Sequence, residues 1–262
     1  MNIGVSSACL YPMLTEESLN KLINIGFRHF EIFINSNGEL KSEYISTIRS
    51  ILDKHDSKVI SIHPYISGFE PCLIFSDYYR RFEDSVFIYE RFFKAASDYN
   101  AKYVVMHGDR IRNPVLITDE EYFKRFKVLS ELADKYSVTL VQENVNLFRS
   151  SDPKFIKSMR NYLKDRAKFV LDTKQCIRSG CCVYDMLRAM GDNIVLIHVS
   201  DHDEKSDCIL PGRGNFDFLK FSNMLLEKGY KGDLIIELYN SGVSSLDALW
   251  NSYLYLKRIF DV

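Results

Sequence analysis

The sequence has no long apolar run and no strong charge bias, and no signal peptide is expected. None of its 262 residues begins a stretch of about 18 apolar residues, so no transmembrane helix is expected. The N-terminal residues lack a basic segment followed by an apolar stretch. Lys and Arg total 34 and Asp and Glu total 35, for a net charge of -1. This balance gives no electrostatic reason to expect nucleic acid or a membrane as a partner.

Cysteine pairs and a glycine-rich nucleotide motif are also missing. The six cysteines form no CxxC pair, which favours reduced thiols in a cytoplasmic protein over a disulfide framework. A metal or redox cluster of Cys176, Cys181 and Cys182 is the sharper alternative. No GxGxxG follows the first predicted strand, which argues against a dinucleotide-binding sheet.

Short apolar, β-branched runs recur along the chain at roughly regular intervals, with helical patterns between them. Thr118 and Glu121 have the spacing of a helix capping box, and Asp152 precedes a proline as an N-cap residue does. Large apolar residues repeat at helical spacing over residues 77–100. The eight predicted strands are 3–6, 29–34, 58–63, 103–107, 138–143, 168–172, 194–199 and 233–238.

Strands that alternate with helices imply a parallel sheet with right-handed crossovers. Eight such units fit a closed (β/α)₈ TIM barrel better than an open sheet. No linker or low-complexity tract divides the chain, so residues 1–262 are predicted to form one domain. The longest irregular stretches, 64–75 and 200–214, both follow strands, where the functional loops of a barrel lie.

Ionisable residues end six of the eight predicted strands. The carboxyl ends of barrel strands converge on one mouth, so these residues form a candidate site. A single histidine at a strand end is more often a hydrogen-bonded core residue, but six positions together indicate function. They are His63, His107, Glu143, Asp172, His198 and Glu237.

The last four of these residues have the composition of a metal site. Glu143, Asp172 and Glu237 would repel one another, and their pKa values would rise, unless a cation lay among them. Their oxygen atoms favour Mn²⁺ or Mg²⁺, and the imidazole of His198 also suits Co²⁺ or Zn²⁺. The alternative is a salt-bridged network without a metal.

The whole chain resembles the xylose-isomerase-like barrel superfamily, which includes sugar and sugar-phosphate isomerases and epimerases and endonuclease IV. The matching segments are VQEN, LDTKQ, IHVSD, LPGRGNFDF and IIELY. The resemblance implies that Glu143, Asp172, His198 and Glu237 bind one divalent metal ion. It also implies that Glu143 and Glu237 act as the acid/base pair.

The resemblance further implies which residues bind substrate. His63 and His107 match metal ligands of endonuclease IV and substrate-facing groups of sugar isomerases, and we interpret both as substrate-binding. Gln175 stands where these families commonly have a histidine, and it is expected to bind a hydroxyl group. Epimerases tend to carry an arginine after the seventh strand, and either Lys205 or Arg213 could supply this cation here.

Two weaker expectations concern the surroundings of the site. Glu31 either orients a neighbouring group or pairs with Arg28. Aromatic residues that follow or end strands could form an apolar wall against the C–H faces of a sugar, and they are Tyr11, Phe33, Tyr65, Phe69 and Tyr239.

We therefore predict a metal-dependent isomerase or epimerase of a sugar, sugar phosphate or related polyol, acting through an enediolate. One alternative is a hydrolase or lyase of the same barrel, such as an endonuclease IV-like phosphodiesterase or a dehydratase. Gln175 argues against DNA repair, as do Ser206-Asp207-Cys208 in place of an Asp-x-His pair. The other alternative is a non-catalytic sugar-binding barrel. Barrels of this family often form homo-oligomers, although no interface is legible in the sequence.

Overall fold

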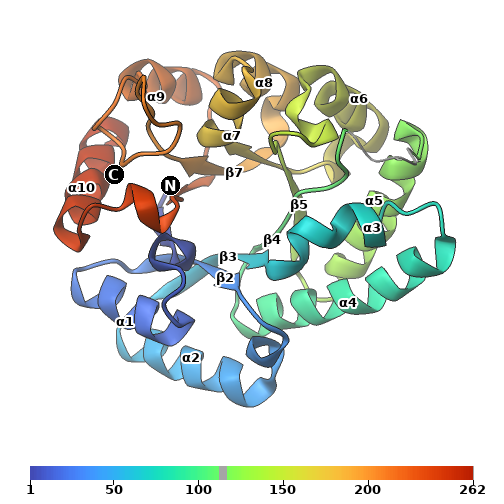
Figure 1. Cartoon of the computed structure of the whole chain (residues 1–262), viewed down its shortest axis with the longest axis horizontal. Helices are drawn as coiled ribbons and strands as arrows, with labels where there is room; N and C mark the ends of the chain where they lie inside the picture. The colour runs from blue at the N-terminus through green and yellow to red at the C-terminus, as the bar shows by residue number, and fades with distance from the viewer. Residues whose placement is uncertain (112–116, 262) are drawn as a thin grey trace.

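The computed structural model describes residues 1–111 and 117–261. Eight parallel strands follow one another in chain order around a closed barrel, and β1 pairs with β8 to complete it (Figure 1). The predicted single-domain TIM barrel is therefore confirmed. The strands are β1 Ile3–Ser6, β2 His29–Ile34, β3 Lys58–Pro64, β4 Tyr103–Met106, β5 Thr139–Glu143, β6 Phe169–Asp172, β7 Ile194–Val199 and β8 Asp233–Ile236.

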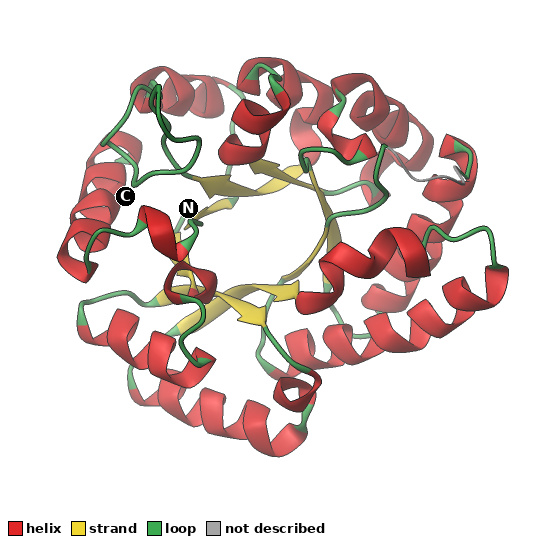
Figure 2. Ribbon diagram, viewed as in Figure 1, coloured by secondary structure: helices red, strands yellow, loops and turns green. Residues whose placement is uncertain are grey.

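Helices enclose the barrel on its outside (Figure 2). In the described residues they are α1 Thr15–Asn24, α2 Ser42–Lys54, α3 Glu70–Leu73, α4 Tyr79–Asp98, α5 Asp119–Asp134, α6 Pro153–Leu163, α7 Thr173–Ser179, α8 Val183–Met190, α9 Phe218–Glu227 and α10 Leu246–Phe260. None of them is long and apolar enough to cross a membrane.

Two helix starts follow the capping signals in the sequence. The Thr118 hydroxyl accepts a hydrogen bond from the Glu121 backbone N–H at 3.1 Å, and the Asp152 carboxylate caps α6 ahead of its proline. The reciprocal half of the capping box is replaced, because the Glu121 carboxylate pairs with Arg125 Nε at 2.8 Å. Such caps satisfy backbone donors that have no partner within the helix.

The barrel interior contains a small apolar cluster beneath its mouth. It is formed by Ile60, Val105, Val141, Val170, Leu196 and Ile235. Successive side chains of a strand point to opposite faces, so residues two apart share a face. On five strands the ionisable residue lies two positions beyond the cluster member, as Glu143 lies beyond Val141 and His198 beyond Leu196. The ionisable residues therefore form the next layer toward the mouth.

On β3 the interval is three residues, from Ile60 to His63. The pairing of β2 with β3 shifts by one residue after Phe30, and the shift passes over Ile60. Beyond it, Glu31 lies opposite Ser61 and the ladder continues to His63. An irregularity of this kind reverses the alternation, so His63 joins the polar layer although its spacing differs.

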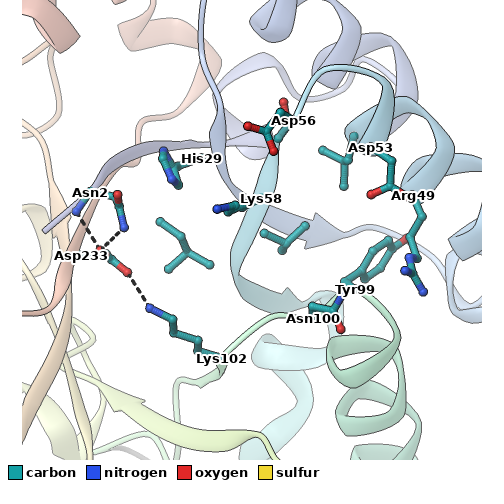
Figure 3. Close-up of a pocket in the computed structure, with 14 residues that line it drawn as sticks. Asn2, His29, Arg49, Asp53, Asp56, Lys58, Tyr99, Asn100, Lys102 and Asp233 are labelled. Atoms are coloured by element: carbon teal, nitrogen blue, oxygen red, sulfur yellow. Dashed lines mark hydrogen bonds and ion pairs between the residues drawn. The ribbon is translucent and has the colours of Figure 1, made fainter.

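A cavity of about 550 Å³ lies at the opposite, amino-terminal end of the strands (Figure 3). Asp233 accepts hydrogen bonds there from the backbone and side-chain nitrogens of Asn2, both at 2.8 Å. Lys102 Nζ lies 3.4 Å from the same carboxylate. These contacts join the first and last strands, which is a stabilising role usual for this end of a barrel.

Candidate active site

The structure brings Glu143, Asp172, His198 and Glu237 together at the carboxyl ends of β5 to β8. Each offers one donor atom, and the four atoms lie within 4.8 Å of one another. His198 Nδ1 lies 3.2 Å from Glu237 Oε2 and 3.5 Å from Glu143 Oε1. All four residues are buried. β8 ends at Ile236, so Glu237 is the first residue after its strand.

Glu31 fixes the orientation of His198. Its Oε2 lies 3.1 Å from His198 Nε2 and accepts a hydrogen bond from Ser61 Oγ at 2.8 Å. This contact leaves His198 Nδ1 facing the carboxylates of the cluster. Of the two roles expected for Glu31, the structure places it in the orienting one. Arg28 instead donates to backbone carbonyl groups.

Asp172 is held by its neighbours on two sides. Asn144 accepts a hydrogen bond from the Asp172 N–H at 2.8 Å and donates to the Asp172 carbonyl at 3.0 Å. Asp172 Oδ1 accepts from the Gln175 N–H at 3.0 Å and so caps α7. The side-chain oxygen of Gln175 accepts from the backbone N–H of Asn146. Oδ2 of Asp172 is left facing the cluster.

Lys174 enters the same cluster from the first turn of α7. Its ammonium lies 3.1 Å from Glu237 Oε2 and 3.3 Å from Asp172 Oδ2. Burial alone would lower the pKa of Lys174, but the facing carboxylates outweigh burial and hold it well above its ordinary value. The amine therefore carries a charge and is not a free nucleophile. Sequence reasoning did not single out this residue.

Neighbouring side chains of the chain itself lower the pKa values of both glutamates. Burial raises the pKa of Glu143, but the imidazoles around it, His107 foremost, outweigh burial and keep it well below its ordinary value. The pKa of Glu237 is also held well below its ordinary value, because Lys174 and His198 outweigh burial. The expected mutual rise of carboxylate pKa values is thus offset at these two positions.

Asp172 and His198 show the opposite behaviour. Burial together with the charges of Glu143 and Glu237 raises the pKa of Asp172 well above its ordinary value. Burial lowers the pKa of His198, but Glu31 and the two cluster glutamates outweigh it and hold the pKa well above its ordinary value. Without a metal, both groups therefore favour their protonated forms.

His63 and His107 meet beside Glu143. Their Nε2 atoms lie 3.0 Å apart, and His107 Nε2 lies 3.0 Å from Glu143 Oε2. These three residues form a second candidate metal group, which shares Glu143 with the first. The Phe33 ring stacks on His63 with centroids 4.7 Å apart, so Phe33 contributes an aromatic surface next to the cluster.

The loop after β4 is anchored from behind. Gln142 Nε2 donates to the carbonyl oxygens of Met106, His107 and Glu143, and Gln142 Oε1 accepts from the Tyr122 hydroxyl. Gly108 packs directly against this hydroxyl with φ +96°. His107, the first residue after β4, is thereby held at the edge of the cluster.

Lys205 and Arg213 lie exposed on the loop after β7. The loop is organised around Asp201, whose Oδ2 accepts from the backbone N–H groups of Gly212 at 3.0 Å and Gly214 at 2.9 Å. The LPGRGNFDF segment that resembles the family therefore contains the glycines that bind Asp201 and shape this loop. The substrate-binding roles of Lys205 and Arg213 stay predictions.

The donor set fits a divalent ion. Asp172 Oδ2 and His198 Nδ1 are buried in the cluster without a hydrogen bond of good geometry. Buried polar atoms of this kind normally have a partner, and a cation would supply one. The six cysteines are free thiols, and neither candidate metal group found in the described residues includes one.

A closed parallel barrel with buried carboxylates and imidazoles at its mouth defines a TIM barrel with a candidate metal centre. Residues 19–257 match the family described as xylose isomerase-like TIM barrel, and the chain belongs to this family. An uncharacterized protein of Mycobacterium tuberculosis, Rv0498, is 23% identical over 270 residues, covering 94% of this chain and 91% of the relative.

Solved structures share the whole fold. A D-tagatose 3-epimerase-like protein has a TM-score of 0.83 and 20% identity, covering 100% of this chain and 97% of that one. The IOLI protein with a bound zinc atom has a TM-score of 0.79 and 16% identity, covering 100% of both chains. At these identities the structural matches establish the fold.

Proposed function

We propose that the protein is a divalent-metal-dependent isomerase or epimerase of a sugar, sugar phosphate or related polyol. The observation that carries this proposal is the buried group of Glu143, Asp172, His198 and Glu237, whose donor atoms lie within 4.8 Å of one another. The names of the structural neighbours, a D-tagatose 3-epimerase-like protein among them, support the substrate class.

The four residues would hold one divalent ion. Three carboxylates favour Mn²⁺ or Mg²⁺, the imidazole also suits Co²⁺ or Zn²⁺, and the IOLI structure contains zinc. When bound, the ion supplies positive charge that stabilises negative charge developing on the substrate oxygens.

Glu143 and Glu237 transfer the proton in this proposal. Both lie close to His198 Nδ1, at 3.5 and 3.2 Å, and they come from the carboxyl ends of two different strands. One carboxylate takes a proton from the carbon next to the carbonyl group, and the other returns a proton to the resulting enediolate. His107 contacts Glu143 and Lys174 contacts Glu237, so a separate partner orients each base.

Three residues expected to contact substrate lie beside Glu143, and they are His63, His107 and Phe33. His107 is 21% exposed and can reach a hydroxyl group at the mouth, whereas His63 is almost fully buried beside it. Phe33 offers an apolar face for the C–H groups of a sugar ring or chain.

The test uses Mn²⁺-loaded protein with a panel of ketoses and ketose phosphates in D₂O. Deuterium should enter the carbon next to the carbonyl group during turnover. Glu143→Gln and Glu237→Gln should each lose about 10²-fold or more in turnover while retaining metal. Near-normal turnover in both variants would refute the acid/base roles. Turnover without deuterium entry would indicate a shielded proton or a hydride shift instead.

A metal-dependent hydrolase or lyase is the second candidate. The group of His63, His107 and Glu143 favours it, because a shared carboxylate between two ion sites is an arrangement suited to two-metal hydrolysis. Metal content per chain separates the two proposals. One tightly bound ion supports the isomerase, and two ions support the hydrolase.

A further inference from the structure

Lys174 places an ammonium group inside the proposed metal centre. The residue is 4% exposed, and its Nζ contacts one oxygen each of Glu237 and Asp172 at 3.1 and 3.3 Å. The Tyr239 ring covers the ammonium, with its centroid 5.1 Å from Nζ. Arg178 donates a 2.7 Å hydrogen bond to the Tyr239 hydroxyl and so holds the ring in place.

Burial of a lysine at this position is unfavourable unless its charge interacts with nearby groups. Taking an ammonium out of water carries a large desolvation penalty, which only close ionic partners offset. Lysine side chains on the first turn of a helix ordinarily extend into solvent. Here the side chain is directed into the barrel mouth and ends on two oxygens that belong to predicted metal ligands.

We propose that Lys174 lowers the negative charge of the metal centre by one unit and thereby sets its affinity and its preference for divalent ions. When all three carboxylates are ionised to bind a cation they carry three negative charges, and the ammonium of Lys174 reduces this to two. A cation entering the cluster is attracted by the carboxylates and repelled by Lys174. The inference rests on the proposed function only in requiring that the cluster bind a metal ion.

The central variant is Lys174→Met, which keeps a side chain of similar length and removes the charge. Affinity for Mn²⁺ should rise by about tenfold or more, on the scale of one neighbouring charge acting on a ligand group. The interaction of a fixed charge with an ion is proportional to the ion's charge. A tenfold gain for Mn²⁺ therefore corresponds to a gain of about thirtyfold for trivalent Tb³⁺.

This dependence on ion charge separates the proposal from a purely structural role. If Lys174 only aligned Glu237 and Asp172, its removal would weaken the binding of both ions, or would change the two affinities by the same factor. Lys102→Met is the matched control, because Lys102 also pairs with a carboxylate, Asp233, but at the other end of the barrel. This variant should bind both ions as the wild type does.

Calorimetric titration of the metal-free proteins with Mn²⁺ and with Tb³⁺ measures these affinities, and circular dichroism checks the fold. Unchanged or weaker Mn²⁺ binding by folded Lys174→Met, or equal gains for the two ions, would overturn the inference alone. Wild-type protein that binds neither ion would overturn the proposed metal-dependent function. If Lys174→Met does not fold, Lys174→Gln is titrated in the same way with the same expected gains.

Discussion

Glu31 contacts His198 in the candidate metal centre and is not one of the four proposed ligands. We expect Glu31→Gln to weaken divalent metal binding by about 10- to 100-fold, the usual effect of losing a carboxylate behind a ligating histidine. Glutamine has nearly the same volume, so the closely packed barrel interior should remain intact. The side chain is fully buried, so water does not replace the lost interaction.

The magnitude follows from the contacts of Glu31. The 3.1 Å contact with His198 Nε2 joins an imidazole to a carboxylate, and hydrogen bonds to charged groups are about twice as strong as neutral ones. A glutamine oxygen facing His198 would lose about 1.4 kcal/mol, which is tenfold in affinity. A glutamine amide group facing it would favour the tautomer with a proton on Nδ1, which cannot bind the ion, and the loss would be larger.

Calorimetric titration of metal-free Glu31→Gln with Mn²⁺ and Zn²⁺ tests this expectation. Ser61→Ala is the matched control, because it removes the other hydrogen bond to Glu31 Oε2 and leaves the contact with His198. The control should bind metal with an affinity within about threefold of the wild type. A single neutral hydrogen bond contributes about 0.5–1.5 kcal/mol, and this one affects His198 only through Glu31. A folded Glu31→Gln protein with wild-type affinity would show that His198 needs no orienting partner.

Three further results are expected. Asp172→Ala should abolish metal binding in a titration, and thermal melting should show a folded barrel that is less stable by about 1 kcal/mol through the lost helix cap. Loss of both metal binding and the fold would favour a purely structural network. Metal affinity should rise with pH, by up to about tenfold per unit for each displaced proton, because the raised pKa values of Asp172 and His198 keep both residues protonated in the metal-free protein at pH values below those pKa values. Calorimetry in buffers of different ionisation enthalpy measures the protons released, and a pH-independent affinity would contradict this expectation. Gly108→Ala should lower the free energy of unfolding in urea by about 2–4 kcal/mol, because it adds a Cβ at φ +96° against the Tyr122 hydroxyl. Gly180→Ala is the control, and it should lower this free energy by only about 1 kcal/mol, because Gly180 has φ +68° with open space around it. An equal decrease in both variants would contradict the packing argument.

The barrel and the ionisable residues at its strand ends can be predicted from local patterns in the amino-acid sequence. The apolar runs and capping signals are local, and they locate all eight strands to within about two residues. Glu143 and Asp172 follow Val141 and Val170 at an interval of two. The alternation of side chains along a strand therefore predicts that they share the inner face.

The partners of these residues depend on the tertiary structure. Lys174 lies two residues after Asp172, but its other partner, Glu237, is 63 positions away, directly after β8. Glu31 meets His198 across 167 positions, and only closure of the barrel brings them together. Lys205 and Arg213 were expected near the substrate because of their place in the chain, yet the loop that carries them is shaped by the backbone contacts of Asp201. Side chains alternate along a strand, so the sequence alone predicts which of them face the site. The direction of a side chain on a loop or on a first helical turn depends on the groups that the fold places around it.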